Sequence, residues 1–142
     1  MMELKSFFSA AVAAVGCVIT SLFGGFDKGI AILLIFMLLD FILGIIVAGV
    51  FGASNKTESG ALESRAGWKG LCRKFGTLAV VLVACLLDNL MGSDYIRDAV
   101  VICYLCNEVL SIIENLALMG VPVPDKIKNA LDVLKSKHDR DK

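Results

Sequence analysis

Residues 103–115, CYLCNEVLSIIEN, set carboxylates and amides into a background that is otherwise apolar. Steps of three or four residues bring these polar groups onto one side of a helix. Side chains of this kind can bind protons or a cation, form hydrogen bonds between helices, or line a water-filled space. In a bilayer, such a stripe has to face protein or water rather than lipid. The polar stripe consists of Tyr104, Asn107, Glu108, Ser111, Glu114 and Asn115.

Asp40 lies in the middle of a second apolar run, residues 29–51. A charge at the bilayer centre costs about 2.5–3.5 kcal/mol, so this carboxylate needs a partner, water or a proton. Gly44, Ala48 and Gly52 follow it at four-residue steps. Small residues in such a column allow a second helix to approach closely. Two interpretations remain open, a packing seam between helices and a pore-lining face.

A similar column of small residues and one acid follows in a third apolar run. Gly76, Ala84 and Asp88 share a four-residue spacing there. Arg73 and Lys74 stand just before this run. Long basic side chains near a helix end extend toward the headgroups, so we expect both at the inner interface of the membrane. The third run therefore predicts another packing or lining face with a basic end.

Enzyme chemistry finds no support among the remaining reactive residue types. Cys103 and Cys106 form a C-x-x-C without a second Cys or His pair nearby, and the single histidine, His138, lies in a charged tail. The five cysteines favour no disulfide framework. A formal net charge of zero gives no indication of nucleic-acid binding. We therefore expect no catalytic residue, no metal and no cofactor.

Composition and run lengths predict an all-α integral membrane protein. Of the 142 residues, 57% are hydrophobic and only 20% are charged, and the mean hydropathy is +0.78. A helix needs about 20 residues to cross the hydrocarbon core. The sequence predicts one membrane domain, residues 1–142, with three to four transmembrane helices. The number stays open because the first run is rich in Ala, Gly and Ser and is therefore the least lipophilic. The expected helices are 6–26, 29–51, 75–92 and 99–119.

The distribution of basic residues predicts the orientation. Five of the 14 lysines and arginines lie in the loop 52–74, and six lie in the tail 120–142. Segments rich in Lys and Arg remain cytoplasmic, so the loop and the C-terminal tail are placed inside. Apolar residues at helical spacing in the tail, from Ile127 to Leu134, predict a short amphipathic helix.

In its order of motifs the chain resembles the toxin-secretion/phage-lysis holins, small membrane proteins of phages of Gram-positive bacteria and of clostridial toxin loci. The resemblance covers about residues 29–134 and rests on LLIFMLLDFILGIIVAGVFG, GWKGLCRKFGTLAVVLVACLLD and NEVLSIIENLALMGVPVPDKIKNAL. The combined pattern is specific, although each fragment alone is weak. The positions that match the family are Asp40, Gly44, Gly70, Arg73, Lys74, Gly76, Asp88, Asn107, Glu108, Ser111, Glu114, Asn115, Gly120, Pro122 and Pro124.

This resemblance implies a holin, a multi-pass protein of the bacterial cytoplasmic membrane. Such proteins form homo-oligomers in the lipid bilayer and open lesions at a programmed time. A cytoplasmic endolysin, or a secreted toxin in some loci, then crosses as cargo.

Two other functions remain open on the residues alone. In a small proton-coupled exporter, Asp40, Glu108 and Glu114 would bind protons or a cation. Against it, the chain shows no inverted repeat and no proline in the middle of a run. A scaffold of a phage or secretion assembly, without a pore, is the third interpretation.

Overall fold

The structure is a computed structural model that describes residues 2–22, 27–127 and 129. All regular elements in these residues are helical, which confirms the predicted all-α class. α2 continues directly into a short π-helical segment, η1, before the chain enters a loop. The elements are α1 (Met2–Leu22), α2 (Lys28–Ile46), η1 (Val47–Phe51), α3 (Ser64–Met91) and α4 (Tyr95–Leu118).

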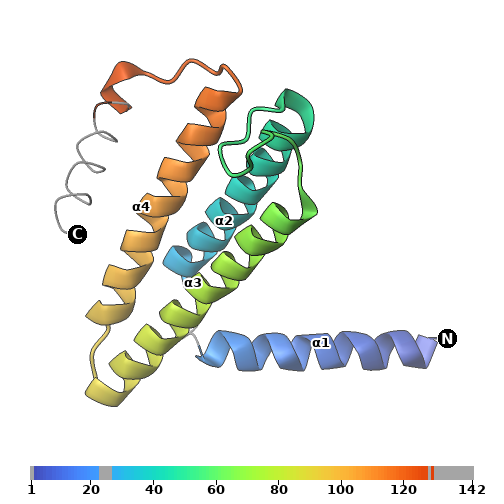
Figure 1. Ribbon diagram of the computed structural model, residues 1–142. Coiled ribbons are helices and arrows are strands. Elements are labelled where there is room, and N and C mark those ends of the chain that lie inside the picture. Colours follow the sequence, from blue (N-terminus) through green and yellow to red (C-terminus); the bar gives the residue numbers. More distant parts are fainter. Residues whose placement is uncertain (1, 23–26, 128, 130–142) are drawn as a thin grey trace.

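Three of the helices lie side by side as a bundle, and α1 projects away from it (Figure 1). Within the described residues, the helices long and apolar enough to cross a membrane are 28–51, 64–91 and 95–118. α1 is not among them. Residues 23–26, the end of the first predicted run, lie outside the described residues. The bundle thus supplies three membrane-length helices.

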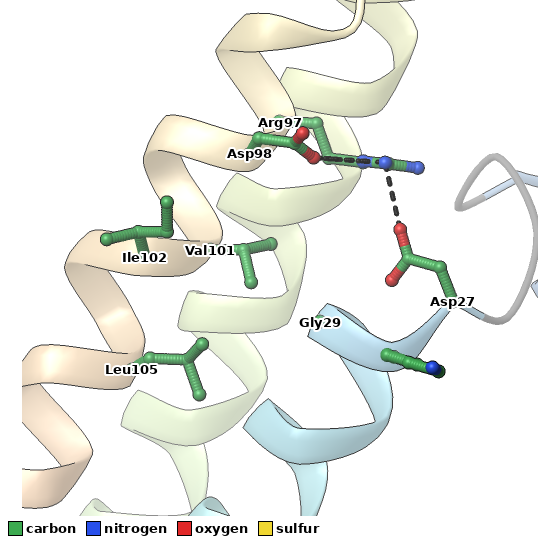
Figure 2. A pocket seen from close by; sticks show the side chains of 8 residues that line it. Asp27, Gly29, Arg97, Asp98, Val101, Ile102 and Leu105 are labelled. Atoms are coloured by element: carbon green, nitrogen blue, oxygen red, sulfur yellow. Dashed lines mark hydrogen bonds and ion pairs between the residues drawn. The ribbon is translucent and has the colours of Figure 1, made fainter.

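Local capping explains where two of the bundle helices begin and end. Asp27 caps α2, because its Oδ1 accepts a hydrogen bond from the backbone N–H of Ile30 at 3.0 Å. Gly92 ends α3 with a φ of +66°, a conformation that glycine adopts without strain. Arg97 then ties the start of α4 to α2 through an ion pair with Asp27 at 2.8 Å (Figure 2).

α3 extends well before the apolar run that predicted it. The predicted run starts at residue 75, directly after Arg73 and Lys74. The helix begins at Ser64 and carries Arg65, Lys69 and Arg73 at exposed positions. Exposed basic residues are compatible with a helix that protrudes from the bilayer. Of the predicted tail helix, residues 128 and 130–142 lie outside the described residues.

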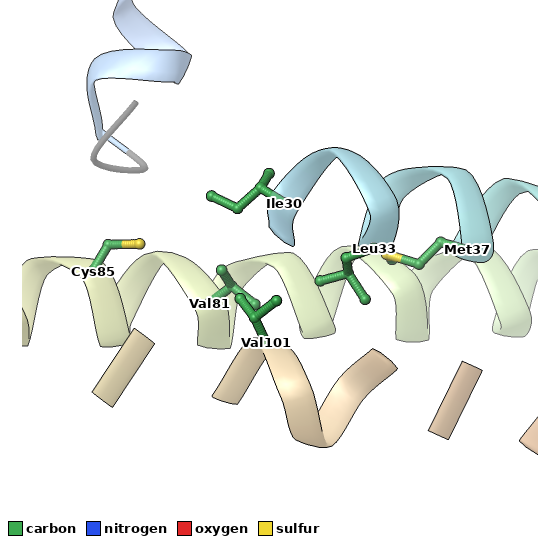
Figure 3. Packing of buried hydrophobic residues seen from close by; sticks show 6 residues of the cluster. All are labelled: Ile30, Leu33, Met37, Val81, Cys85 and Val101. Carbon is green, nitrogen blue, oxygen red and sulfur yellow. The ribbon is translucent and has the colours of Figure 1, made fainter. Parts of the chain in front are cut away.

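An apolar core fills the half of the bundle nearer the α3–α4 turn (Figure 3). All three helices contribute to it, and Leu33 and Val81 are fully buried. Lipid tails are as apolar as these side chains, so close packing rather than exclusion from lipid holds this part together. The core residues are Ile30, Leu33 and Met37 of α2, Val81 and Cys85 of α3, and Val101 of α4.

Candidate functional site

Beyond the apolar core, four polar residues meet in the interior of the bundle, and we call them the central cluster. The ammonium of Lys74 on α3 lies 2.9 Å from Asp40 Oδ2 on α2 and 2.7 Å from Glu108 Oε2 on α4. The Asn115 amide donates to Asp40 Oδ1 at 2.9 Å and to the Asp40 backbone carbonyl at 3.4 Å. One lysine therefore connects all three bundle helices.

The central cluster is buried in spite of its charges. Asp40, Glu108 and Asn115 are 6%, 7% and 3% exposed, and the Lys74 side chain is 14% exposed. A buried charge is tolerated when it is paired and hydrogen-bonded, because removal from water or headgroups is then compensated. Two carboxylates share one ammonium, so the formal charge of the cluster is −1. The ionic groups of this bundle are thus shielded from its surroundings.

The Lys74 ammonium lies opposite the middles of α2 and α4, beside Asp40 and Glu108. Its place relative to the inner interface of the membrane stays a prediction. The length of α3 explains the position opposite α2 and α4, because ten helical residues precede Lys74. Its neighbour Arg73 is exposed. The partner of Asp40 is thus Lys74, which lies just outside the apolar run 75–92 from which the third membrane helix was predicted.

The structure divides the predicted polar stripe of α4. Glu108 and Asn115 are buried in the central cluster, whereas Asn107 is exposed. The other members of the stripe are half-buried, and the Tyr104 ring packs against the apolar core. They are Tyr104, Ser111 and Glu114.

The column of small residues on α2 faces the inside of the same subunit. A Cβ built on Gly44 would lie 4.0 Å from Asn115 Nδ2 of α4. Ala48 is buried, and Gly52 is exposed where η1 ends. α2 and α4 thus pack closely beside Asp40. On α3, Gly76 is exposed with nothing near it, whereas Ala84 is buried.

A second polar group of residues, the turn cluster, joins the helix ends around the α3–α4 connection. Asp88, 3% exposed, accepts hydrogen bonds from Ser93 Oγ at 2.7 Å and from the backbone N–H groups of Ile96 and Arg97 at 3.2 and 2.8 Å. It satisfies free donors at the start of α4, as a capping residue does. We define the turn cluster as Asp27, Asp88, Ser93 and Arg97.

An open hollow of about 440 Å³ lies beside the turn cluster (Figure 2). Val101, Ile102 and Leu105 of α4 form its apolar wall, and Asp27 and Arg97 stand at its rim. Arg97 is already held by Asp27 and by Asp98 at 3.0 Å. The hollow therefore offers little polar chemistry of its own.

The described residues contain no group of three His, Cys, Asp or Glu side chains that could hold a metal ion. Cys103 and Cys106 are exposed on α4 and form no disulfide. Ion pairing and helix association are the chemistry that this arrangement supports.

Sequence reasoning missed two of the contacts that organise the bundle. The Asp27–Arg97 pair had a usable signal, because an Asp just before a long apolar run is a typical N-cap. The role of Lys74 had none, because its partners are 34 residues away in each direction along the chain.

Comparison with known proteins agrees with this membrane architecture. Residues 17–136 match the bacteriophage holin family. A probable holin of Bacillus phage phi105 is 37% identical over 114 residues, which cover 80% of this chain and 78% of that protein. An uncharacterised 14.9 kDa protein in the nagH 3′ region of Clostridium perfringens is 34% identical, with 96% and 99% covered.

An uncharacterised protein of Listeria innocua is also 34% identical, over 89% of this chain and 90% of its own length. No solved structure matches significantly. The family match spans most of the chain, and it includes all three membrane-length helices and the central cluster. The chain therefore belongs to the bacteriophage holin family.

Proposed function

We propose that this protein acts as a holin, which accumulates in the bacterial cytoplasmic membrane and self-associates. At a timed point it opens lesions through which a cytoplasmic endolysin, or a toxin in a toxin locus, leaves the cell. One observation carries the proposal, namely that Asp40 and Glu108 converge on Lys74 inside the bundle, with the Asn115 amide hydrogen-bonded to Asp40. Such a subunit can reside in lipid without leakage and still holds polar groups that can later line water.

The contacts of the central cluster stabilise a closed state of the subunit. Lys74 bridges α2 and α4, so those helices cannot separate without breaking an ion pair or carrying a charge into lipid. An assembled lesion removes this penalty, because water can then solvate the exposed groups. Opening thus becomes favourable only when enough subunits associate, which accounts for a delay followed by an abrupt event.

The proposed orientation places the loop 52–74 and the tail 120–142 in the cytoplasm. Eleven of the 14 basic residues lie in these two segments, five in the first and six in the second. This bias is the usual determinant of topology. The match to a probable phage holin supports endolysin as the cargo.

Inducible expression in bacteria tests the proposal, with a potential-sensitive dye and a co-expressed cytoplasmic endolysin. We expect a delay, then a sudden loss of membrane potential and endolysin-dependent lysis. Gradual depolarisation from the start of induction, or depolarisation that never releases endolysin, would contradict the assignment. Expression of endolysin alone is the control for leakage, and an inactive endolysin separates lesion formation from wall cleavage.

A further inference from the structure

Asn107 is the residue of α4 that the closed bundle leaves unexplained. It lies at the middle of the helix, 12 residues after Tyr95 and 11 before Leu118, and it is exposed. A carboxamide has two donor hydrogens and an acceptor oxygen. Within residues 2–22, 27–127 and 129, no group forms a hydrogen bond with this side chain. Hydrocarbon offers no partner either, so an amide at this depth calls for another protein surface.

The exposed face around Asn107 differs from the exposed face of α2. Exposed small residues also occur on α3, at Cys72, Gly76 and Ala79, but no amide lies among them. Cys103 and Ala99 precede Asn107 by four and eight residues, on the same side of the helix, and Cys106 and Ile102 lie beside them; all four are exposed. Small side chains let the backbone of a second helix approach closely. The exposed side chains at comparable positions of α2 are large and aliphatic, as lipid-facing ones are: Ile32, Ile35, Leu38, Ile42 and Ile45.

We propose that the α4 face formed by Ala99, Cys103, Cys106 and Asn107 binds the same face of a second copy of this chain. All copies enter the membrane with one orientation, so a two-fold axis between them runs along the membrane normal. Identical residues then meet at the same depth. The Asn107 amides of the two copies can donate to each other's carbonyl oxygens, which satisfies both. The face is therefore self-complementary in polarity.

This dimer is compatible with closed subunits. Glu108 and Asn115 lie on the other side of α4, in the central cluster, so association leaves the Lys74 contacts intact. The inference rests on the proposed function, since it names the first partner surface of the self-association from which lesions would grow. In this scheme the dimers form during the delay before opening, and larger assemblies form later through additional contacts.

The native cysteines provide the test. In isolated membranes, an oxidant is added to variants that keep Cys103 alone or Cys106 alone, with the other four cysteines replaced by alanine. The matched control keeps Cys72 alone, which is exposed on α3. We expect several-fold more disulfide-linked dimer with Cys103 or Cys106 than with Cys72. Equal yields for all three, or a higher yield for Cys72, would overturn the proposal.

Asn107→Leu supplies the second comparison. In the Cys103 variant it should lower the dimer yield several-fold, whereas Asn89→Leu, at an exposed amide of α3, should leave it unchanged. Energy transfer between fluorescently tagged copies of the otherwise native chain in vesicles should also be lower for Asn107→Leu than for Asn89→Leu. This measurement does not depend on the cysteine variants, so a folding defect in them would not affect it. An Asn107→Leu chain that pairs as well as wild type in both assays would refute the contact. Dimers without lysis would reject the holin function alone, and lysis without α4 dimers would reject this interface alone.

Discussion

The central cluster and the turn cluster are built from the same kinds of groups, yet they connect different things. In the central cluster, Lys74 joins residues that lie 34 positions away along the chain in each direction. In the turn cluster, Asp88 binds groups only five to nine residues ahead. The first joins three helices in the middle of the bundle. The second shapes the α3–α4 connection at its end, and the Asp27–Arg97 pair ties that end to the start of α2.

Their surroundings differ as well. The Asp27 carboxylate that pairs with Arg97 is 40% exposed, whereas the Asp40 and Glu108 side chains are 8% and 9% exposed. Asp88 is buried as well, but its partners are a hydroxyl and backbone N–H groups rather than a cation. Water and headgroups can replace a lost contact at a helix end, but nothing replaces it in the interior. We therefore expect equivalent substitutions to cost more in the central cluster.

Lys74→Met should have the largest effect. It leaves Asp40 and Glu108 facing each other without a cation, and loss of one partner of a buried pair costs about 3–5 kcal/mol. The free energy of unfolding in detergent should fall by that amount, as measured by denaturant titration of helicity. Lys69→Met, at an exposed position of the same helix, serves as the control. Adding Asp40→Asn and Glu108→Gln to Lys74→Met should restore most of the loss, and a failure to restore it would argue against pairing as the cause.

Gly44→Leu should disturb the central cluster from the side. A Cβ at this position fits, because it would lie 3.9 Å from Lys56 Nζ and 4.0 Å from Asn115 Nδ2. We expect the longer leucine side chain to displace the Asn115 amide and to push α2 and α4 apart. Overpacking of this kind costs about 1–3 kcal/mol. The same denaturant titration measures it, and Gly44→Ala is the matched control. Equal stability of the Leu and Ala variants would show that α2 and α4 do not pack closely here.

Asp88→Ala should have the smallest effect of the three. It removes hydrogen bonds to Ser93 and to two backbone N–H groups, a loss comparable with that of a helix cap, about 1–2 kcal/mol. Asp94→Ala is the control, because Asp94 precedes α4 but makes no side-chain capping bond. If Asp94→Ala destabilised the protein as much as Asp88→Ala, the capping role of Asp88 would be wrong.

Periodicity and run length predicted much of the fold. They placed three membrane-length helices, and the spacing of Glu108 and Asn115 put both on one face, where the structure buries them. The same stripe included Asn107, which lies one residue before Glu108 and is therefore turned by about 100° around the helix axis. Spacing along one helix therefore defines a face only to within about 100° of rotation. Which residues of that face are buried depends on the neighbouring helices.

The pairing within the central cluster lay beyond sequence reasoning. Lys74 directly precedes an apolar run and follows charged residues, a position typical of a membrane interface. Its depth depends on how far α3 extends beyond α2 and α4, and its partners depend on how each helix is rotated. Neither quantity is encoded in local spacing, whereas the cap at Asp27 is, because a cap needs only the next three residues.

The delay before depolarisation in cells that express Glu108→Gln tests the central claim most directly, namely that the central cluster holds the bundle closed until assembly. Glutamine keeps the shape and hydrogen-bonding capacity of the side chain, and it leaves Lys74 paired with Asp40 in a formally neutral cluster. The change removes the ion pair that ties α4 to Lys74, so α4 can separate without carrying a carboxylate into lipid. Depolarisation should therefore begin earlier than in wild type at equal membrane levels. Glu58→Gln, an equal charge change at an exposed loop position, should leave the onset unchanged. An onset for Glu108→Gln that coincides with wild type, or follows it, would contradict the account.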